Sequence, residues 1–148
     1  MRTLLFIWPL MLFATFGLHV VFSPQVYIDI WWLDIPMHFA GGMGVGFFGL
    51  WLAAWVGLMP LATSKGGFAE RMRRAFPREE WWWPLVIVLG AIAYVGPWWE
   101  QLETFFLAYV GVPIPERYIA DTLIDYMMDA LGAMSAWAAF YFARTRVQ

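Results

Sequence analysis

Four long apolar stretches constrain the fold of this chain more than any other feature. Each has 20 residues or more, and about 20 helical residues cross the hydrocarbon core of a bilayer. A backbone in hydrocarbon must satisfy its own hydrogen bonds, so such stretches fold as helices. Only 14% of the residues are charged, against about 25% in soluble domains. We therefore predict an all-α integral membrane bundle of four transmembrane helices, with spans at about 3–22, 35–59, 83–110 and 119–143.

The distribution of Lys and Arg predicts the orientation of this bundle. Eight of the nine basic residues lie near the N-terminus, in the loop 60–82 or near the C-terminus, and only Arg117 lies elsewhere. With four spans these three regions share one side, which the positive-inside rule makes cytoplasmic. We predict a single transmembrane domain over residues 1–148 of a cell inner (cytoplasmic) membrane, with both termini cytoplasmic. The absence of cysteine excludes thiolate chemistry, and no nucleic-acid-binding module is present.

Polar residues recur at helical spacing within three of the predicted spans. Residues three or four apart lie on one face of a helix, which groups Asp34 with His38, Glu100 with Glu103, and Asp121 with Asp125 and Asp129. At 1.5 Å per residue, the deeper acids of the last two groups lie about 9–15 Å below the outer surface. Carboxylates at such a depth are costly, and they are candidate functional residues for that reason. We predict that three helices bring them together in one pocket open to the outer face.

Each polar residue has an assigned place in this pocket. The predicted metal ligands are His38, Glu100, Glu103, Asp125 and Asp129, and Glu103 and Asp125 are the candidate catalytic groups. Asp34, Asp121 and Arg117 are assigned to the mouth. Two alternatives concern these mouth residues: Asp34 could cap the second helix, and Asp121 could pair with Arg117. His19 is interpreted as an interfacial residue without a role in the site.

Small residues predict close packing beside the pocket. Gly42 and Gly46 are four apart, a spacing that lets another helix approach closely. Gly132 and Ala133 permit the same approach just beyond Asp129.

The charge of the cluster requires an explanation, because no Lys or Arg lies at this depth within the spans. Either some carboxyl groups are protonated, or a multivalent cation binds among them. Oxygen ligands favour Mg²⁺, Ca²⁺ or Mn²⁺, and an added imidazole favours Mn²⁺, Fe²⁺ or Zn²⁺. The di-iron bundle pattern needs two Glu-x-x-His pairs, which this sequence lacks. We expect a divalent cation whose identity is left open, because a cation also accounts for the histidine.

Three segments resemble the polar signatures of VanZ-like membrane proteins and the related YjdF-like family. In order, they are "DIPMHFAGG", "WEQLE" and "DTLIDYMMDALGA". The resemblance covers Asp34–His38, Glu100–Glu103 and Asp121–Ala133, and it does not extend to the first span. It implies a small helical bundle of a bacterial or archaeal cell envelope, and the VanZ name is attached to resistance to the glycopeptide teicoplanin. It implies no chemical mechanism.

Three departures make this chain more acidic than the family it resembles. Ile35 stands where VanZ-like proteins usually have Lys, Glu103 where they have Gln, and Asp129 where they usually have Asn. Each change removes a positive charge or adds a negative one. These changes favour a requirement for a cation. They make a role in antibiotic resistance less favoured than the resemblance alone would.

These observations lead to one main functional hypothesis. The site binds a divalent cation that assists a reaction on a membrane lipid or a lipid-linked envelope substrate, which would make the chain a metal-dependent enzyme of the outer leaflet. The alternatives are a proton or cation transporter, a cation-binding protein, and an envelope resistance or assembly factor without catalysis. No acid occurs in 49–59 or 136–143 to lead toward the cytoplasm, which favours a one-sided site. The sequence does not indicate an oligomeric state.

Overall fold

A computed structural model describes residues 7–21, 30–56, 82–109, 111 and 118–145 of the chain. Within them lie four long helices and one short 3-10 helix, η1 (Trp31–Leu33), and no strand occurs in these ranges. The long helices are α2 (Trp8–Val21), α4 (Asp34–Trp55), α6 (Trp82–Tyr109) and α7 (Tyr118–Thr145). The all-α prediction is confirmed. Residues 60–81 of the predicted cytoplasmic loop 60–82 lie outside the described ranges, and Trp82 already belongs to α6.

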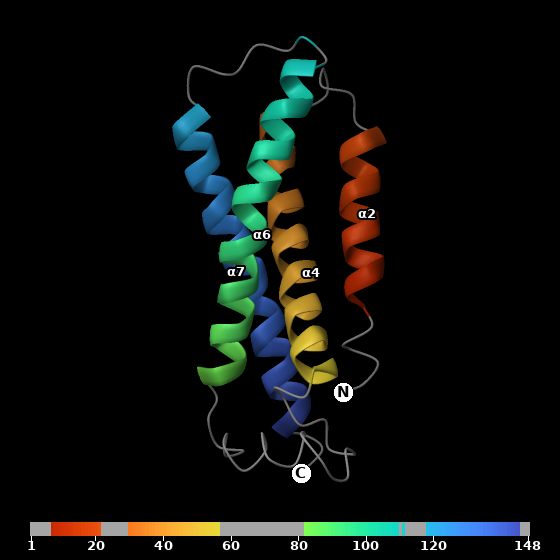
Figure 1. Ribbon diagram of the computed structural model, residues 1–148, viewed down its shortest axis with the longest axis vertical. Coiled ribbons are helices and arrows are strands. Elements are labelled where there is room, and N and C mark those ends of the chain that lie inside the picture. Colours follow the sequence, from red (N-terminus) through yellow and green to blue (C-terminus); the bar gives the residue numbers. More distant parts are fainter. Residues whose placement is uncertain (1–6, 22–29, 57–81, 110, 112–117, 146–148) are drawn as a thin grey trace.

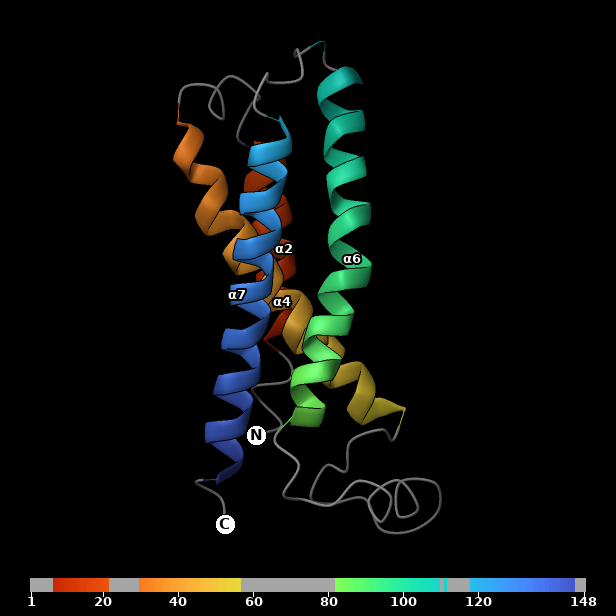
Figure 2. The same ribbon diagram turned by 90° about the vertical axis from the view of Figure 1, so that its left-hand side faces the viewer.

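Consecutive helices run in opposite directions along the bundle (Figure 1). The C-terminal ends of α2 and α6 therefore lie at the same end as the N-terminal ends of α4 and α7. We call this the acidic end, because the polar cluster described below lies in this half. Helix α4 contacts each of the other three long helices, most extensively α7. It runs obliquely across the bundle (Figure 2).

Glycines set the distance between α4 and α7. A Cβ atom on Gly42 would overlap the backbone of Asp129, and one on Gly132 would overlap the carbonyl oxygen of Phe39. One turn further along, a Cβ on Gly46 would lie 2.9 Å from the Cβ of Ala136. The two backbones are thus in direct contact at Gly42 and Gly132. This confirms the close approach predicted from the spacing of the small residues.

The buried polar side chains and most of the buried apolar ones occupy different halves of the bundle, and Met37, beside His38, is an exception. The half away from the acidic end holds the hydrophobic core, formed by Phe47, Leu50, Ala53, Val88, Ala133, Ala136 and Phe140. The buried polar residues His38, Glu100, Asp125 and Asp129 all lie in the acidic half. Side chains that would be costly in hydrocarbon are therefore concentrated at one end only.

The outer surface of the bundle is apolar. Large hydrophobic side chains on every long helix are exposed, for example Phe13 at 78%, Phe105 at 71% and Ile119 at 77%. Water-soluble proteins rarely expose contiguous apolar surface of this extent. By length and composition, α4 and α6 qualify as membrane spans. Helix α7 is less apolar and carries three aspartates, and α2 has 14 residues.

Candidate functional site

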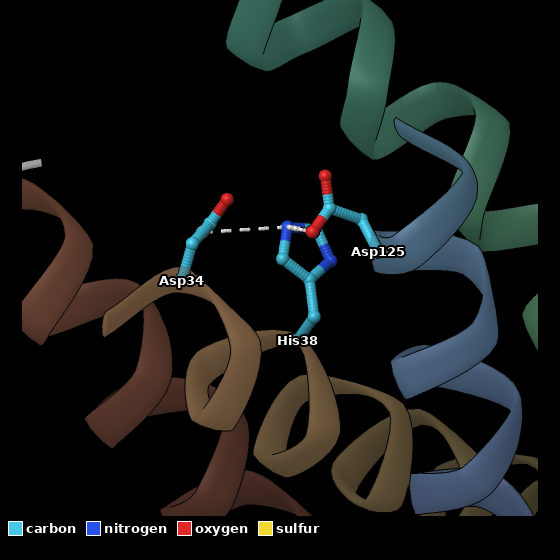
Figure 3. A group of neighbouring side chains, drawn as sticks. All are labelled: Asp34, His38 and Asp125. Atoms are coloured by element: carbon cyan, nitrogen blue, oxygen red, sulfur yellow. Dashed lines mark ion pairs between the residues drawn. The ribbon is translucent and has the colours of Figure 1, made fainter. Parts of the chain in front are cut away.

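His38 is the centre of the polar cluster. It lies one turn into α4 and is 4% exposed. Its Nε2 atom lies 3.5 Å from Asp34 Oδ1, 3.8 Å from Asp125 Oδ1 and 3.9 Å from Glu103 Oε2. Figure 3 shows the imidazole between Asp34 and Asp125. Three helices therefore direct a carboxylate toward one ring nitrogen.

The other ring nitrogen faces a fourth carboxylate. His38 Nδ1 lies 3.3 Å from Asp129 Oδ1. Asp129 reaches this position because α4 and α6 have no side chain there: its backbone touches Gly42, and its Oδ2 atom would be 3.5 Å from a Cβ on Gly96. The glycines that bring the helices together thus also make room for this aspartate.

Glu100 and Glu103 complete the cluster from α6. Glu100 is 6% exposed, and its Oε1 atom has no hydrogen-bond partner among the described residues. Near Glu100, the Thr104 hydroxyl donates a hydrogen bond of 2.8 Å to the Glu100 carbonyl oxygen. The same hydroxyl shares a hydrogen bond of 2.7 Å with the hydroxyl of Tyr118. This link ties the acidic half of α6 to the start of α7.

The cluster contains two sets of residues, each of which could hold a cation. The first set is Asp34, His38 and Asp125, and the second is His38, Glu100 and Glu103. Within each set, one ligand atom from each residue lies within 4.8 Å of the others. His38 belongs to both sets.

The structure brings most of the predicted site residues together. The five predicted ligands lie in one cluster, and Asp34 lies within it rather than at its edge. The alternative of Asp34 as a helix cap is wrong: Leu33 occupies the cap position, without a side-chain cap hydrogen bond. Asp121 is exposed, about one turn before Asp125. Arg117, which was assigned to the mouth, lies outside the described residues.

The sequence interpretation missed the position of His19. Its Nε2 atom lies 3.8 Å from Glu103 Oε1, so both carboxylate oxygens of Glu103 face an imidazole. The Trp99 ring meets the His19 ring edge-on, with centroids 5.2 Å apart. One signal was available, since the chain has only two histidines and both lie near the acidic end of their helices.

A cavity of about 240 Å³ adjoins the cluster. His19, Asp34, His38 and Asp129 border it, and its remaining wall is largely apolar and comes from α2, α4 and α6. A small molecule or ion in this cavity would therefore meet the polar cluster directly.

Taken together, the apolar outer surface, the antiparallel helices and the acids confined to the interior define an integral membrane protein with a buried carboxylate–histidine site. The chain belongs to the family described as "Predicted membrane protein (DUF2238)", which matches residues 2–146. That match confirms a membrane-protein family, and its description does not mention VanZ-like or YjdF-like proteins. No curated protein matches the chain significantly, and neither does any solved structure.

Proposed function

We propose that the chain binds a divalent cation in the carboxylate–histidine cluster and uses it in a reaction on a lipid or cell-envelope substrate at the outer leaflet. The observation that carries this proposal is the convergence of Asp34, Glu103 and Asp125 on Nε2 of His38. These residues come from three helices, and their distances from Nε2 are 3.5–3.9 Å.

The distances suit groups that share an ion. Two ligand atoms bound to one ion at about 2.1 Å are roughly 3.0–3.5 Å apart at coordination angles of 90–109°. The observed separations are a few tenths of an ångström longer. The Nε2 atom of His38, Oδ1 of Asp34 and Oε1 of Glu100 are also buried without a hydrogen-bond partner among the described residues. Buried polar atoms normally have partners, and a cation bound in either set would supply one for His38 and for the carboxylates of that set.

Asp129 has a different role in this proposal from that of the other acids. It faces Nδ1 of His38 at 3.3 Å, on the opposite side of the ring from the other carboxylates. A carboxylate there accepts the Nδ1–H and leaves the Nε2 lone pair for the metal, as in many histidine-ligated sites. Sequence reasoning placed Asp129 among the ligands. The geometry favours an orienting role instead.

The donor set indicates what chemistry the site could support. Several carboxylates with one imidazole suit Mn²⁺, Fe²⁺ or Zn²⁺ more than Mg²⁺ or Ca²⁺. A bound cation can polarise a phosphoryl or carbonyl oxygen. A carboxylate that is not a ligand can act as general base, and Glu103 and Asp125 are the candidates.

Transport across the membrane is the second candidate function, and the position of the core disfavours it. Beyond Asp129 the described interior is the hydrophobic core from Phe47 to Ala53 on α4 and from Ala133 to Phe140 on α7. A proton or cation path needs polar groups or water. The resemblance to VanZ-like and YjdF-like proteins supports an envelope location for the site and leaves open a binding or assembly role without catalysis.

The first prediction tests the cation. Purified wild-type protein is expected to contain about one equivalent of divalent metal and to lose thermal stability on chelation, because the carboxylates then repel one another. Asp125→Asn and Glu103→Gln are expected to lose the metal with the helical content retained. The exposed Asp121→Asn is the matched control and should keep it.

The measurements are metal analysis by mass spectrometry and thermal unfolding followed by circular dichroism. If the wild-type protein contains no metal and keeps the same stability after chelation, protonated carboxyl groups explain the cluster better than a cation. Metal retained in both Asp125→Asn and Glu103→Gln would also contradict the site.

The second prediction concerns topology: four spans with both termini cytoplasmic and the acidic end outward. The absence of native cysteine permits single-cysteine variants at Ser23, Ser64 and Pro113. An impermeant thiol reagent added to intact cells should label the variants at 23 and 113 and leave the one at 64 unlabelled. The reverse pattern would place the site at the cytoplasmic face.

A further inference from the structure

A second cavity lies between α2 and α6, beside the cluster. It has a volume of about 290 Å³, close to the lower end of the ligand pockets of proteins at about 300–1,000 Å³. Its wall is apolar and aromatic, with Phe16 from α2 and Leu102, Phe105 and Phe106 from α6. Tyr109, the last residue of α6, marks its other limit. We call this cavity the α2–α6 groove.

The α2–α6 groove leads to the polar cluster. Its only ionisable groups besides Tyr109, among the described residues, are His19 and Glu103, which lie 3.8 Å apart. Glu103 in turn lies 3.9 Å from His38. The groove and the cavity of about 240 Å³ beside the cluster share Phe16, His19 and Trp99. The polar pair therefore lies midway along an apolar wall, with Trp99 on its inner side and Phe105 and Tyr109 on its outer side along α6.

We propose that the α2–α6 groove holds a hydrocarbon chain of a membrane lipid that carries a primary amine, with the ammonium group at Glu103. The occupant is amphiphilic because the wall is apolar and carries one polar pair, His19 and Glu103. Its chain runs from Glu103 past Phe16 and Trp99 toward the adjoining cavity and the middle of the bilayer. It reaches the site from the side, through the bilayer, between α2 and α6. This inference rests on the proposed function only for the reaction that the bound lipid would undergo. The groove itself is present whether or not a cation binds.

Charge complementarity decides the headgroup. The cluster holds five carboxylates, from Asp34, Glu100, Glu103, Asp125 and Asp129, against the two imidazoles of His19 and His38. No Lys or Arg side chain is among those that the structure describes, and Arg117, which was assigned to the mouth from the sequence, would add one positive charge. One divalent cation would leave the cluster acidic. An anionic headgroup would be repelled by it, whereas an ammonium can donate three hydrogen bonds to carboxylates.

The test uses the full chain in phosphatidylcholine nanodiscs, with two photoreactive lipids that share the same diazirine-bearing acyl chain. One has an ethanolamine headgroup and the other a glycerol headgroup. After irradiation, the labelled residues are identified by mass spectrometry. The ethanolamine lipid is expected to label the groove residues of α2 and α6 about tenfold more than the glycerol lipid does. That ratio corresponds to about 1.4 kcal/mol, close to one charge-assisted hydrogen bond.

Two variants separate the groove from the general lipid surface. Leu102→Trp fills the groove and should remove the selective labelling, whereas Leu123→Trp on α7 should leave it unchanged. The two leucines are matched in exposure, at 54% and 59%. Neither belongs to the cation-binding sets, so both variants should keep the metal content of the wild type.

Equal labelling of all lipid-facing helices would overturn the groove, and equal labelling by the two lipids would overturn recognition of the amine. Metal content is measured on the same samples. Selective labelling of a protein without metal would support the groove and contradict the cation, so the failures of the two proposals are distinguishable.

Discussion

Replacing His38 with alanine is expected to lower the affinity for a divalent cation by more than about 100-fold, the largest effect of any single change in the site. His38 belongs to both candidate ligand sets, so neither set survives its loss. The change also leaves neighbouring carboxylates without the imidazole. The variant should therefore be less stable as well, and its helical content has to be checked before binding is measured. The affinities are measured by titrating each variant with Mn²⁺ in a calorimeter.

Asp129→Asn distinguishes an orienting role from a ligating role. If Asp129 fixes the His38 ring through Nδ1, the loss of affinity should be about 10–100-fold, smaller than for His38→Ala. Asp121→Asn, at an exposed position on the same helix, should change the affinity less than about twofold, because its charge is screened by solvent. A loss in Asp129→Asn as large as in Asp125→Asn would make Asp129 a ligand. Unchanged affinity in His38→Ala would exclude the imidazole from the site.

Gly42→Ala is expected to destabilise the protein by about 2–3 kcal/mol, despite the higher helix propensity of alanine. The added methyl group would overlap the Asp129 backbone, and a backbone cannot move aside as the end of a flexible side chain can. Helices α4 and α7 would have to separate. Because Asp129 lies at this contact, cation affinity should fall in the same variant. Unfolding in mixed detergent micelles, followed by circular dichroism, measures the stability.

Gly90→Ala is the matched control. Gly90 is also within a helix, and no atom lies within 4 Å of the position its Cβ would take. This variant should be neutral or stabilised by up to about 1 kcal/mol through helix propensity. Equal stability of the two variants would show that the α4–α7 contact yields easily, and it would remove the packing argument for the position of Asp129.

The asymmetry between the two halves of the bundle bears on the choice among functions. A transporter needs its binding site to reach both sides in turn, and here the described interior beyond Asp129 is packed with aliphatic and aromatic side chains. The chemistry is therefore expected at one face only. An outward site would meet lipids and envelope precursors, which is consistent with an apolar groove beside it.

The sequence by itself determined the helical class, the starts of three long helices and the candidate acids. Hydropathy is a local property, so the apolar stretches predicted three helix starts to within one residue: α4 at Asp34, α6 at Trp82 and α7 at Tyr118. Spacing is local too. It put Glu100 with Glu103, and Asp125 with Asp129, on shared helix faces. The acids of the different helices lie at similar predicted depths in the membrane, which indicated that these faces could meet.

Only the tertiary structure decided which atoms meet. Helical periodicity defines a face of a helix and not the neighbour that this face contacts, so it could not show that Nε2 and Nδ1 of His38 face different carboxylates. The position of His19 beside Glu103 depends on how α2 packs against the rest of the bundle, and no local pattern encodes that packing. The α2–α6 groove has the same origin. The rotation and separation of the helices are fixed by contacts such as that between Gly42 and Asp129, which join residues far apart in the chain.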